Sequence, residues 1–464
     1  MPRRLTILFT LASIIPLLVH ADEPQPEDVL EPLRVGVFDV DVSPPVGSPL
    51  AYDRCDAVAM SLRANGIIIL TQDQPIVLCS VDWIGIANAA HTQWRLAIAE
   101  AVDTTIDRVT VHTLHQHDAP FCDFSANAIL AKRGLGGTLF DVNFAQKTIT
   151  NVAKAVKQAA TNATTVTHVG IGQATVEKVA SNRRILGPEG TVRATRYTAC
   201  RDAELRNEPE GTIDPQLKSI SFWNQETPVV VMTYYATPPQ SYYRRGVATP
   251  DFPGIARFLR QVTLNGLPHI HFNGAGGNIG AGKYNDGSEN NRQTLATRLA
   301  EGMAAAYANT KRIEVSARDV RWRATEIAIP PATHLNELQL LQILDDENET
   351  TVNRGIAATN LAWLRRCKGG ATLSVTCMDI GPASIVHLPG EAVVEYQLFA
   401  QQLRPDRFTA VAAYGDYGTG YICLEEHYAQ GGYEASPQAS RVAPHVETVL
   451  KDAIRSVILT AIAE

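Results

Sequence analysis

The fold is indicated first by the apolar runs Ile67-Ile68-Ile69-Leu70 and Pro75-Ile76-Val77-Leu78-Cys79-Ser80-Val81-Asp82-Trp83, which predict two paired strands. Residues 89–102 follow with apolar side chains three and four positions apart, which predicts an amphipathic helix, and residues 109–114 predict a further strand. Similar patterns predict helices at 144–160, 252–264, 292–308, 338–344, 353–363 and 446–462, and strands at 166–171, 219–223, 229–236, 268–272, 319–329 and 384–387. This mixture predicts an α/β fold with mixed β-sheets sandwiched between layers of helices. No linker rich in Gly, Ser or Pro divides the chain, so we expect a single large domain.

Composition excludes several classes of protein. Of 464 residues, 45% are hydrophobic and 19% are charged, which is typical of a folded globular chain. The net charge of −7, without a basic cluster, argues against nucleic-acid binding. The seven cysteines are too few and too scattered for a disulfide scaffold, although a bridge between Cys367 and Cys377 across a Gly-Gly turn is open.

The N-terminus has the pattern of a secretory signal peptide. Met1-Pro2-Arg3-Arg4 is basic, residues 5–19 are apolar, and Val19-His20-Ala21 offers a cleavage site near Ala21. The alternative is a membrane anchor, but the apolar run falls short of the ~20 residues that span a bilayer. We therefore expect a signal peptide at 1–21, a flexible lead-in at 22–33, and a secreted or periplasmic protein. No second apolar stretch of membrane length follows, so no integral membrane span is predicted. No protein partner is predicted from the sequence either.

A histidine cluster is the first candidate site. His112-Thr113-Leu114-His115-Gln116-His117-Asp118 lies at the end of a predicted strand. Positions 115 and 117 of an extended segment place both imidazoles on one face, where a metal can reach one or both. An incidental histidine-rich loop is equally consistent with the spacing.

Three further segments stand out. In the glycine-rich loop 273–284, Tyr284 replaces the Ser or Thr that a phosphate loop needs, so we reject nucleotide binding. We expect instead a backbone bend whose dihedral angles only glycine tolerates and which lets the chain approach a substrate or another strand closely. Glu391 in Leu388-Pro389-Gly390-Glu391 is predicted to open a helix, where an acidic residue also simply favours the helix dipole. Tyrosines gather in the segment 414–433, either lining a binding wall or packing structurally.

Together these segments resemble the neutral/alkaline ceramidase family, zinc-dependent hydrolases of N-acyl-sphingosine amides. The opening Val35-Gly36-Val37-Phe38-Asp39-Val40-Asp41-Val42-Ser43-Pro44-Pro45-Val46-Gly47 is similar to that family's start, and the order of the later motifs also matches. The resemblance covers residues 34–464, which would form the family's N-terminal-type domain without its C-terminal immunoglobulin-like domain. It looks most like the shorter bacterial ceramidase-like proteins, and it implies a lipid-like amide as the substrate.

The resemblance also implies roles for individual residues. It implies zinc as the cofactor, with His115, Glu391 and Tyr421 as ligands and His117 beside the metal. Tyr433 matches the tyrosine that acts on the scissile carbonyl, and Arg183 matches an arginine that holds substrate. The predicted catalytic residues are thus Tyr433 and His117, and the predicted substrate-binding positions are Arg183 and Gly280.

Two departures leave the function open. Pro238 in Tyr235-Ala236-Thr237-Pro238 stands where the family has its second histidine ligand, and proline has no side-chain lone pair. Gly280 stands where the family has its catalytic serine. With His115, Glu391 and Tyr421 the ligand count is three, and His117 raises it to four, so a zinc site with an activated water is still feasible. The alternatives are a ceramidase-like amide hydrolase, a zinc hydrolase of another small amide or ester, and a catalytically degenerate lipid- or glycan-binding relative.

Overall fold

The structure is a computed structural model that describes residue 2 and residues 32–460. The predicted signal peptide and nearly all of the predicted lead-in lie outside the described residues, so export and cleavage near Ala21 stay predictions. Among the described helices, none is long and apolar enough to cross a bilayer.

The first sheet contains the strands that the opening sequence predicts. Its order is β6-β4-β3-β1-β8, and only β4 and β6 run parallel. In β3, Ile67 and Ile69 face a core shared with other sheets, whereas Ile68 faces the outer helices, as the two-residue period of a strand requires. The elements are β1 (Leu33–Asp41), β3 (Arg63–Leu70), β4 (Ile76–Val81), β6 (Val109–Thr113) and β8 (Thr164–Val166), covered by α1 (Ala89–Ala101) and α3 (Val142–Thr161).

Two more sheets complete the framework. The second sheet has the order β16-β14-β13-β9-β18 and consists of β9 (His168–Thr175), β13 (Gln216–Asn224), β14 (Thr227–Tyr235), β16 (His269–Asn273) and β18 (Lys311–Glu314), with α5 (Asp251–Thr263) and α6 (Asn290–Ala308) against it. The third has the order β19-β20-β21-β23 and consists of β19 (Val320–Ile327), β20 (Leu373–Ile380), β21 (Ala383–His387) and β23 (Phe408–Ala412), packed by α9 (Val394–Leu403) and α11 (Val446–Leu459).

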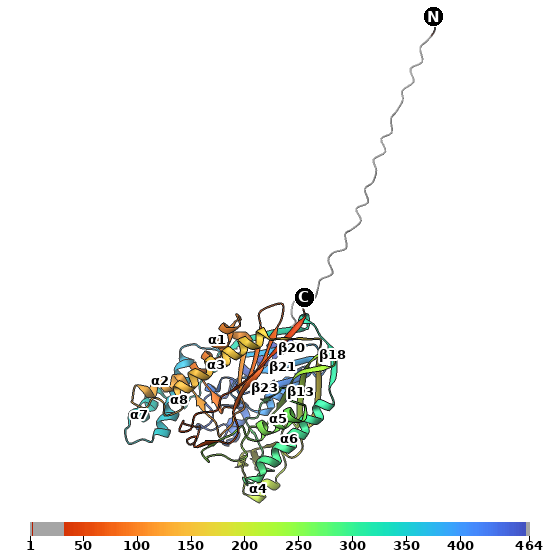
Figure 1. Ribbon diagram of the computed structural model, residues 1–464. Helices are drawn as coiled ribbons and strands as arrows, with labels where there is room; N and C mark the ends of the chain where they lie inside the picture. The colour runs from red at the N-terminus through yellow and green to blue at the C-terminus, as the bar shows by residue number, and fades with distance from the viewer. Residues whose placement is uncertain (1, 3–31, 461–464) are drawn as a thin grey trace.

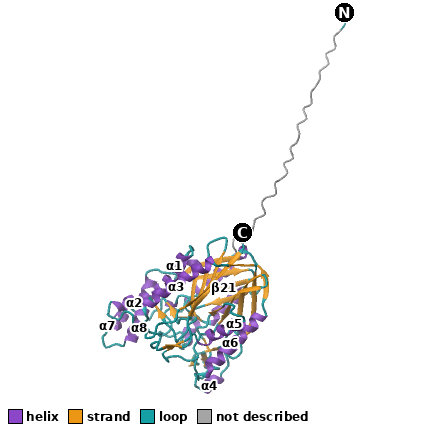
Figure 2. Ribbon diagram, viewed as in Figure 1, coloured by secondary structure: helices purple, strands orange, loops and turns teal. Residues whose placement is uncertain are grey.

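The three sheets share one buried core. Apolar side chains from all three meet there, among them Ile67, Ile220 and Ile385. Figure 1 shows α1 and α3 on one side of the strands and α5 and α6 on another, and Figure 2 shows the strands between these helices. The predicted α/β fold, with mixed sheets between layers of helices, is confirmed.

Shorter elements surround this framework. The helices α2 (Phe124–Ala131), α7 (Glu337–Asp345) and α8 (Thr351–Lys368) form an extension that packs on the third sheet's core. The remaining elements are β2 (Ala57–Val58), β5 (Gly85–Ile86), β7 (Phe121–Cys122), β10 (Ser181–Asn182), β11 (Arg184–Leu186), β12 (Val192–Thr195), β15 (Val247–Ala248), β17 (Ile279–Gly280), β22 (Glu391–Ala392), β24 (Tyr421–Ile422), α4 (Ala203–Asn207) and α10 (Glu425–Gln430), with three short 3₁₀ turns.

Two local expectations differ from the structure. Glu391 does not open a helix, because it lies in the short strand β22 and α9 begins at Val394. The open Cys367–Cys377 bridge is not formed, since all seven cysteines fall within the described residues and are free thiols.

Candidate functional site

The candidate site lies where several parallel strands end. The histidine segment follows β6, Pro238 follows β14, the glycine-rich loop follows β16, Glu391 follows β21 and the tyrosine segment follows β23. Backbone hydrogen bonds tie these segments together: the Thr113 amide donates to the Tyr414 carbonyl (2.9 Å), the Ala413 amide to the Asn273 carbonyl (3.0 Å) and the Gly277 amide to the Ala392 carbonyl (2.9 Å). Residues far apart in sequence thereby meet at one edge, the position at which α/β sheets commonly bind ligands.

His115 has a fixed orientation at this edge. It is 3% exposed, and its backbone has a φ of 63°, a region that non-glycine residues adopt mainly at constrained sites. Its Nδ1 lies 2.9 Å from the Ile84 carbonyl, which only accepts, so we assign the proton to Nδ1. The Nε2 lone pair then faces Oε2 of Glu391 at 3.1 Å. Burial lowers the pKa of His115, which favours the neutral ring.

Glu391 and Tyr421 are direct neighbours. They are paired in the parallel ladder of β22 and β24, a pairing that the sequence did not predict. Tyr417 donates its hydroxyl to the second Glu391 oxygen, Oε1, at 2.5 Å. The turn before Glu391 needs Gly390, whose φ is 54° and where a Cβ would lie 1.9 Å from Thr419 Oγ1. The three predicted ligands, His115, Glu391 and Tyr421, therefore lie in one neighbourhood.

His117 contacts His115 but has different hydrogen-bond partners. The two rings are perpendicular with centroids 4.7 Å apart. The His117 Nδ1 lies 3.0 Å from the His115 carbonyl, and its Nε2 accepts from the side-chain amide of Gln240. The expected extended backbone is wrong at His115, whose φ is positive, but the two imidazoles still lie in contact with each other. Burial holds the pKa of His117 well below its usual range, so the ring is neutral.

Arg183 is held by a buried carboxylate. Its guanidinium lies 2.7 Å from Glu434 and 3.3 Å from the Tyr421 hydroxyl, and it stands 5.7 Å from the centre of the Tyr433 ring. Burial lowers the pKa of Arg183, but its interactions with Tyr421 and with the Glu434 carboxylate hold that pKa well above its usual value, so Arg183 remains a cation. The Tyr433 ring lies 5.7 Å from the Tyr421 ring, and burial raises the pKa of Tyr433, which therefore keeps its proton as a hydrogen-bond donor.

The structure shows what surrounds Gly280 and Pro238, the two residues that depart from the family pattern. Gly280 has no positive φ, so the expected dihedral reason for glycine is wrong. The expected close approach is the actual reason: a Cβ on Gly280 would lie 2.4 Å from Thr198 Cγ2 and 3.3 Å from Arg183 Cδ. Thr198 thus fills the space beside the position at which the resemblance implies a serine. Pro238 lies in the loop after β14 and supplies no donor.

The residues present fit a divalent ion with nitrogen and oxygen donors. Two buried lone-pair acceptors, His115 Nε2 and Glu391 Oε2, face each other at 3.1 Å, and this arrangement requires a proton or a cation between them. A backbone carbonyl that fixes the other ring nitrogen, as Ile84 does here, is the usual support of a metal-binding histidine. Across residues 32–460, however, no three His, Cys, Asp or Glu side chains gather as a metal site. Any metal set built on His115 and Glu391 therefore needs further donors of another type, and the phenol oxygen of the neighbouring Tyr421 is one candidate.

A large groove opens beside this centre. Its volume is about 1470 Å³, and its lining includes Tyr52, Phe121, Val352, Ile356 and Tyr417. Tyr417 contacts Glu391, and the Tyr52 ring stacks on His117 with centroids 5.3 Å apart, so the groove wall and the polar centre share side chains. The lining is mixed: Val352 and Ile356 are exposed apolar side chains, and charged residues such as Arg54, Asp141 and Arg244 also line the groove. The groove exceeds the ~300–1,000 Å³ of most small-molecule sites, so it has room for a large ligand.

Several residues of the centre were not predicted individually. Tyr414 and Tyr417 belong to the tyrosine-rich segment, and that density of phenols was their only sequence signal. Glu434 directly follows Tyr433 and could have been suspected as the partner of a buried arginine. Gln240, whose side-chain amide donates a hydrogen bond to His117, could not be identified as a site residue from the sequence.

Comparisons with known proteins agree with this geometry at the level of the fold. No family model matches the chain, and no curated protein matches it in sequence. The chain is similar to a solved neutral ceramidase from Pseudomonas aeruginosa, with a TM-score of 0.68 and 16% identity over 93% of this chain and 74% of that one. It is also similar to a ceramidase complexed with C2, with a TM-score of 0.64 and 15% identity over 92% of this chain and 75% of that one. The chain therefore has the fold of the neutral ceramidases.

Proposed function

We propose that this protein is a zinc-dependent hydrolase of N-acyl amide bonds, similar to the ceramidases, with His115, Glu391 and Tyr421 as the metal ligands. The observation that carries the proposal is the 3.1 Å approach of His115 Nε2 to Glu391 Oε2, two acceptors that a cation would join. The ceramidase fold of the chain supports the same reaction class. The predicted signal peptide extends the proposal to a secreted or periplasmic enzyme.

The groove supports a lipid-like substrate. Its exposed Val352 and Ile356 and its volume of about 1470 Å³ suit the burial of a long acyl chain, which gains roughly 0.8 kcal/mol per methylene removed from water, and the charged residues of the lining suit a polar group on the same ligand. Tyr52 and Tyr417 line the groove and contact His117 and Glu391, so the groove ends one side chain away from the polar centre; His115, Glu391 and Tyr421 themselves do not line it.

The polar residues of the centre have distinct parts in this proposal. Bound zinc would supply Lewis acidity and a water of lowered pKa. Tyr433 donates a hydrogen bond from its phenol to the developing carbonyl oxyanion. Arg183, held as a cation by Glu434, orients the polar end of the substrate. His117 can take part as a base only after its Nε2 is released from Gln240.

Metal analysis and turnover test the proposal together. The purified chain should contain about one zinc per molecule and release fatty acid from N-acyl-sphingosine. His115→Ala should lose both the zinc and the activity, whereas His168→Ala, at a half-exposed histidine on β9, should keep both. A wild-type protein that binds no zinc at a millimolar concentration and releases no fatty acid would refute it.

The second candidate is a catalytically degenerate, lipid- or glycan-binding relative. It is favoured by Pro238, which cannot coordinate, and by the Thr198 methyl group, which fills the space beside Gly280. Wild-type protein that binds an N-acyl amide without hydrolysing it, with and without added zinc, would favour this alternative. Hydrolysis of other small amides or esters, but not of N-acyl-sphingosine, would instead assign a different substrate to the same centre.

A further inference from the structure

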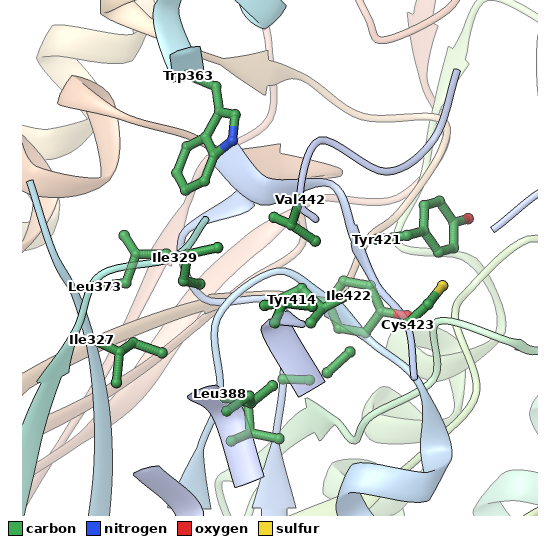
Figure 3. Close-up of a cluster of buried hydrophobic side chains, with 14 of the residues drawn as sticks. Ile327, Ile329, Trp363, Leu373, Leu388, Tyr414, Tyr421, Ile422, Cys423 and Val442 are labelled. Carbon is green, nitrogen blue, oxygen red and sulfur yellow. The ribbon is translucent and has the colours of Figure 1, made fainter. Parts of the chain in front are cut away.

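Tyr414 contributes a buried hydroxyl that nothing in the fold satisfies. The residue follows β23, its side chain is 0% exposed, and its hydroxyl oxygen has no hydrogen-bond partner among the described residues. Buried polar groups are nearly always paired, so an unpaired one needs a cause such as a bound ion or water. Figure 3 shows Tyr414 among the buried side chains of one cluster, to which Tyr421 also belongs.

The Tyr414 ring is part of the candidate site. It stacks on the His115 ring, with centroids 5.1 Å apart and planes inclined by 23°. The backbone φ of 61° at Tyr414 departs from the strand conformation of β23 and re-aims the chain at this point. The strand itself therefore does not dictate the position of this phenol.

The hydroxyl lies beside the proline that replaces the expected ligand. A Cβ built on Gly276 would stand 2.9 Å from Pro238 Cδ and 3.3 Å from the Tyr414 hydroxyl oxygen, so both groups border the same small space. The absence of a side chain at Gly276 keeps that space free. A polar atom is thus present next to the position at which Pro238 offers none.

We propose that the Tyr414 hydroxyl is the fourth protein ligand of the metal site and takes the place that a histidine at position 238 would fill. The set is then His115, Glu391, Tyr421 and Tyr414, one nitrogen and three oxygen donors. This inference rests on the proposed zinc site, and it explains how four protein donors arise although no three His, Cys, Asp or Glu side chains gather in the described part of the chain.

Metal binding to the purified full chain tests the inference without relying on activity. Zn²⁺ affinity is measured by competition with a chelating dye, and the visible absorption of bound Co²⁺ reports the coordination number. Tyr414→Phe should weaken Zn²⁺ binding by more than the ~10–100-fold that loss of an outer-shell partner causes, and should change the Co²⁺ spectrum. Tyr396→Phe is the matched control, because Tyr396 is equally buried but donates its hydroxyl to the Cys423 carbonyl. It should leave both readouts unchanged.

Thermal unfolding separates coordination from packing. Without metal, Tyr414→Phe should melt no lower than the wild type, since it removes an unpaired buried hydroxyl. With Zn²⁺, the upward shift in Tm that the wild type shows should shrink or vanish. In the double variant Pro238→His/Tyr414→Phe, the imidazole should restore part of the affinity.

The outcomes are distinguishable. If the wild type binds Zn²⁺ and Tyr414→Phe binds it equally well, the inference is overturned and an ordinary buried water satisfies the hydroxyl, while the proposed function stands. If the wild type binds neither Zn²⁺ nor Co²⁺, the proposed function itself fails.

Discussion

A serine at position 280 should fit only after Thr198 is trimmed. Gly280→Ser places a Cβ 2.4 Å from Thr198 Cγ2, about 1 Å inside an ordinary carbon–carbon contact. Arg183 Cδ closes the other side at 3.3 Å, and that side chain is fixed by its ion pair with Glu434. Overpacking of this kind lowers the free energy of unfolding by about 1–3 kcal/mol. Because the overlap with Thr198 is large, we expect a loss of about 3 kcal/mol for Gly280→Ser. Thr198→Ser removes the obstructing methyl and should cost about 1 kcal/mol of buried apolar surface.

The double variant measures the coupling. Gly280→Ser/Thr198→Ser should be destabilised by about 1–2 kcal/mol instead of the ~4 kcal/mol sum, a coupling of about 2–3 kcal/mol. Urea unfolding at neutral pH gives all the required free energies. Gly187→Ser is the control, because its Cβ would meet nothing closer than Arg193 Cβ at 3.6 Å. Additive free energies, or a Gly280→Ser variant as stable as Gly187→Ser, would refute the reasoning.

Three further predictions concern the charged groups. Glu434→Gln leaves the buried Arg183 without its counter-charge and should lower the free energy of unfolding by about 3 kcal/mol, whereas Asp345→Asn, at a surface ion pair, should cost under ~1 kcal/mol in the same urea titration. Tyr417→Phe frees Glu391 Oε1 and should weaken Zn²⁺ binding by ~10–100-fold in calorimetric titration, and unchanged affinity would show that Tyr417 does not orient the carboxylate. Acid should destabilise the fold, because burial lowers the pKa of several histidines, and their unfolded forms take up protons below about pH 6.5 while the folded forms do not. Among them, the pKa is about 4 for His91 and about 3 for His269 and His271. These three alone should lower the free energy of unfolding by up to about 4 kcal/mol per pH unit between pH 6 and 5, and equal urea midpoints at pH 7 and 5 would contradict this.

The sequence predicted the framework because most of its elements carry a clear hydrophobic period. The strand at 229–236 is observed as β14 (Thr227–Tyr235), and the helix at 292–308 as α6 (Asn290–Ala308). It missed β20 (Leu373–Ile380), in which buried polar side chains such as Thr376 interrupt the apolar pattern. It also misassigned Glu391, because a two-residue strand has no period and depends entirely on its partner β24.

The sequence predicted which residues belong to the site, but not how their side chains are oriented. The motifs identified His115, Glu391 and Tyr421, and the structure brings them together. The orientation of His117 towards Gln240 depends on a positive φ at His115, which no local pattern encodes. The space beside Gly280 depends on Thr198, which is distant in sequence and close only in the fold.

The polar centre is not explained by the needs of folding. A buried ion pair such as Arg183–Glu434 pays a desolvation cost that apolar side chains of similar size would avoid. Two facing acceptors at His115 and Glu391, a strained φ at His115 and an unpaired Tyr414 hydroxyl each lower the stability of the ion-free protein further. All of them lie in one neighbourhood at one edge of the sheets, beside the groove. A proton or a cation between His115 and Glu391 would relieve the electrostatic conflict there, and under the proposed function that cation is zinc, whose binding would offset the cost of the buried polar groups.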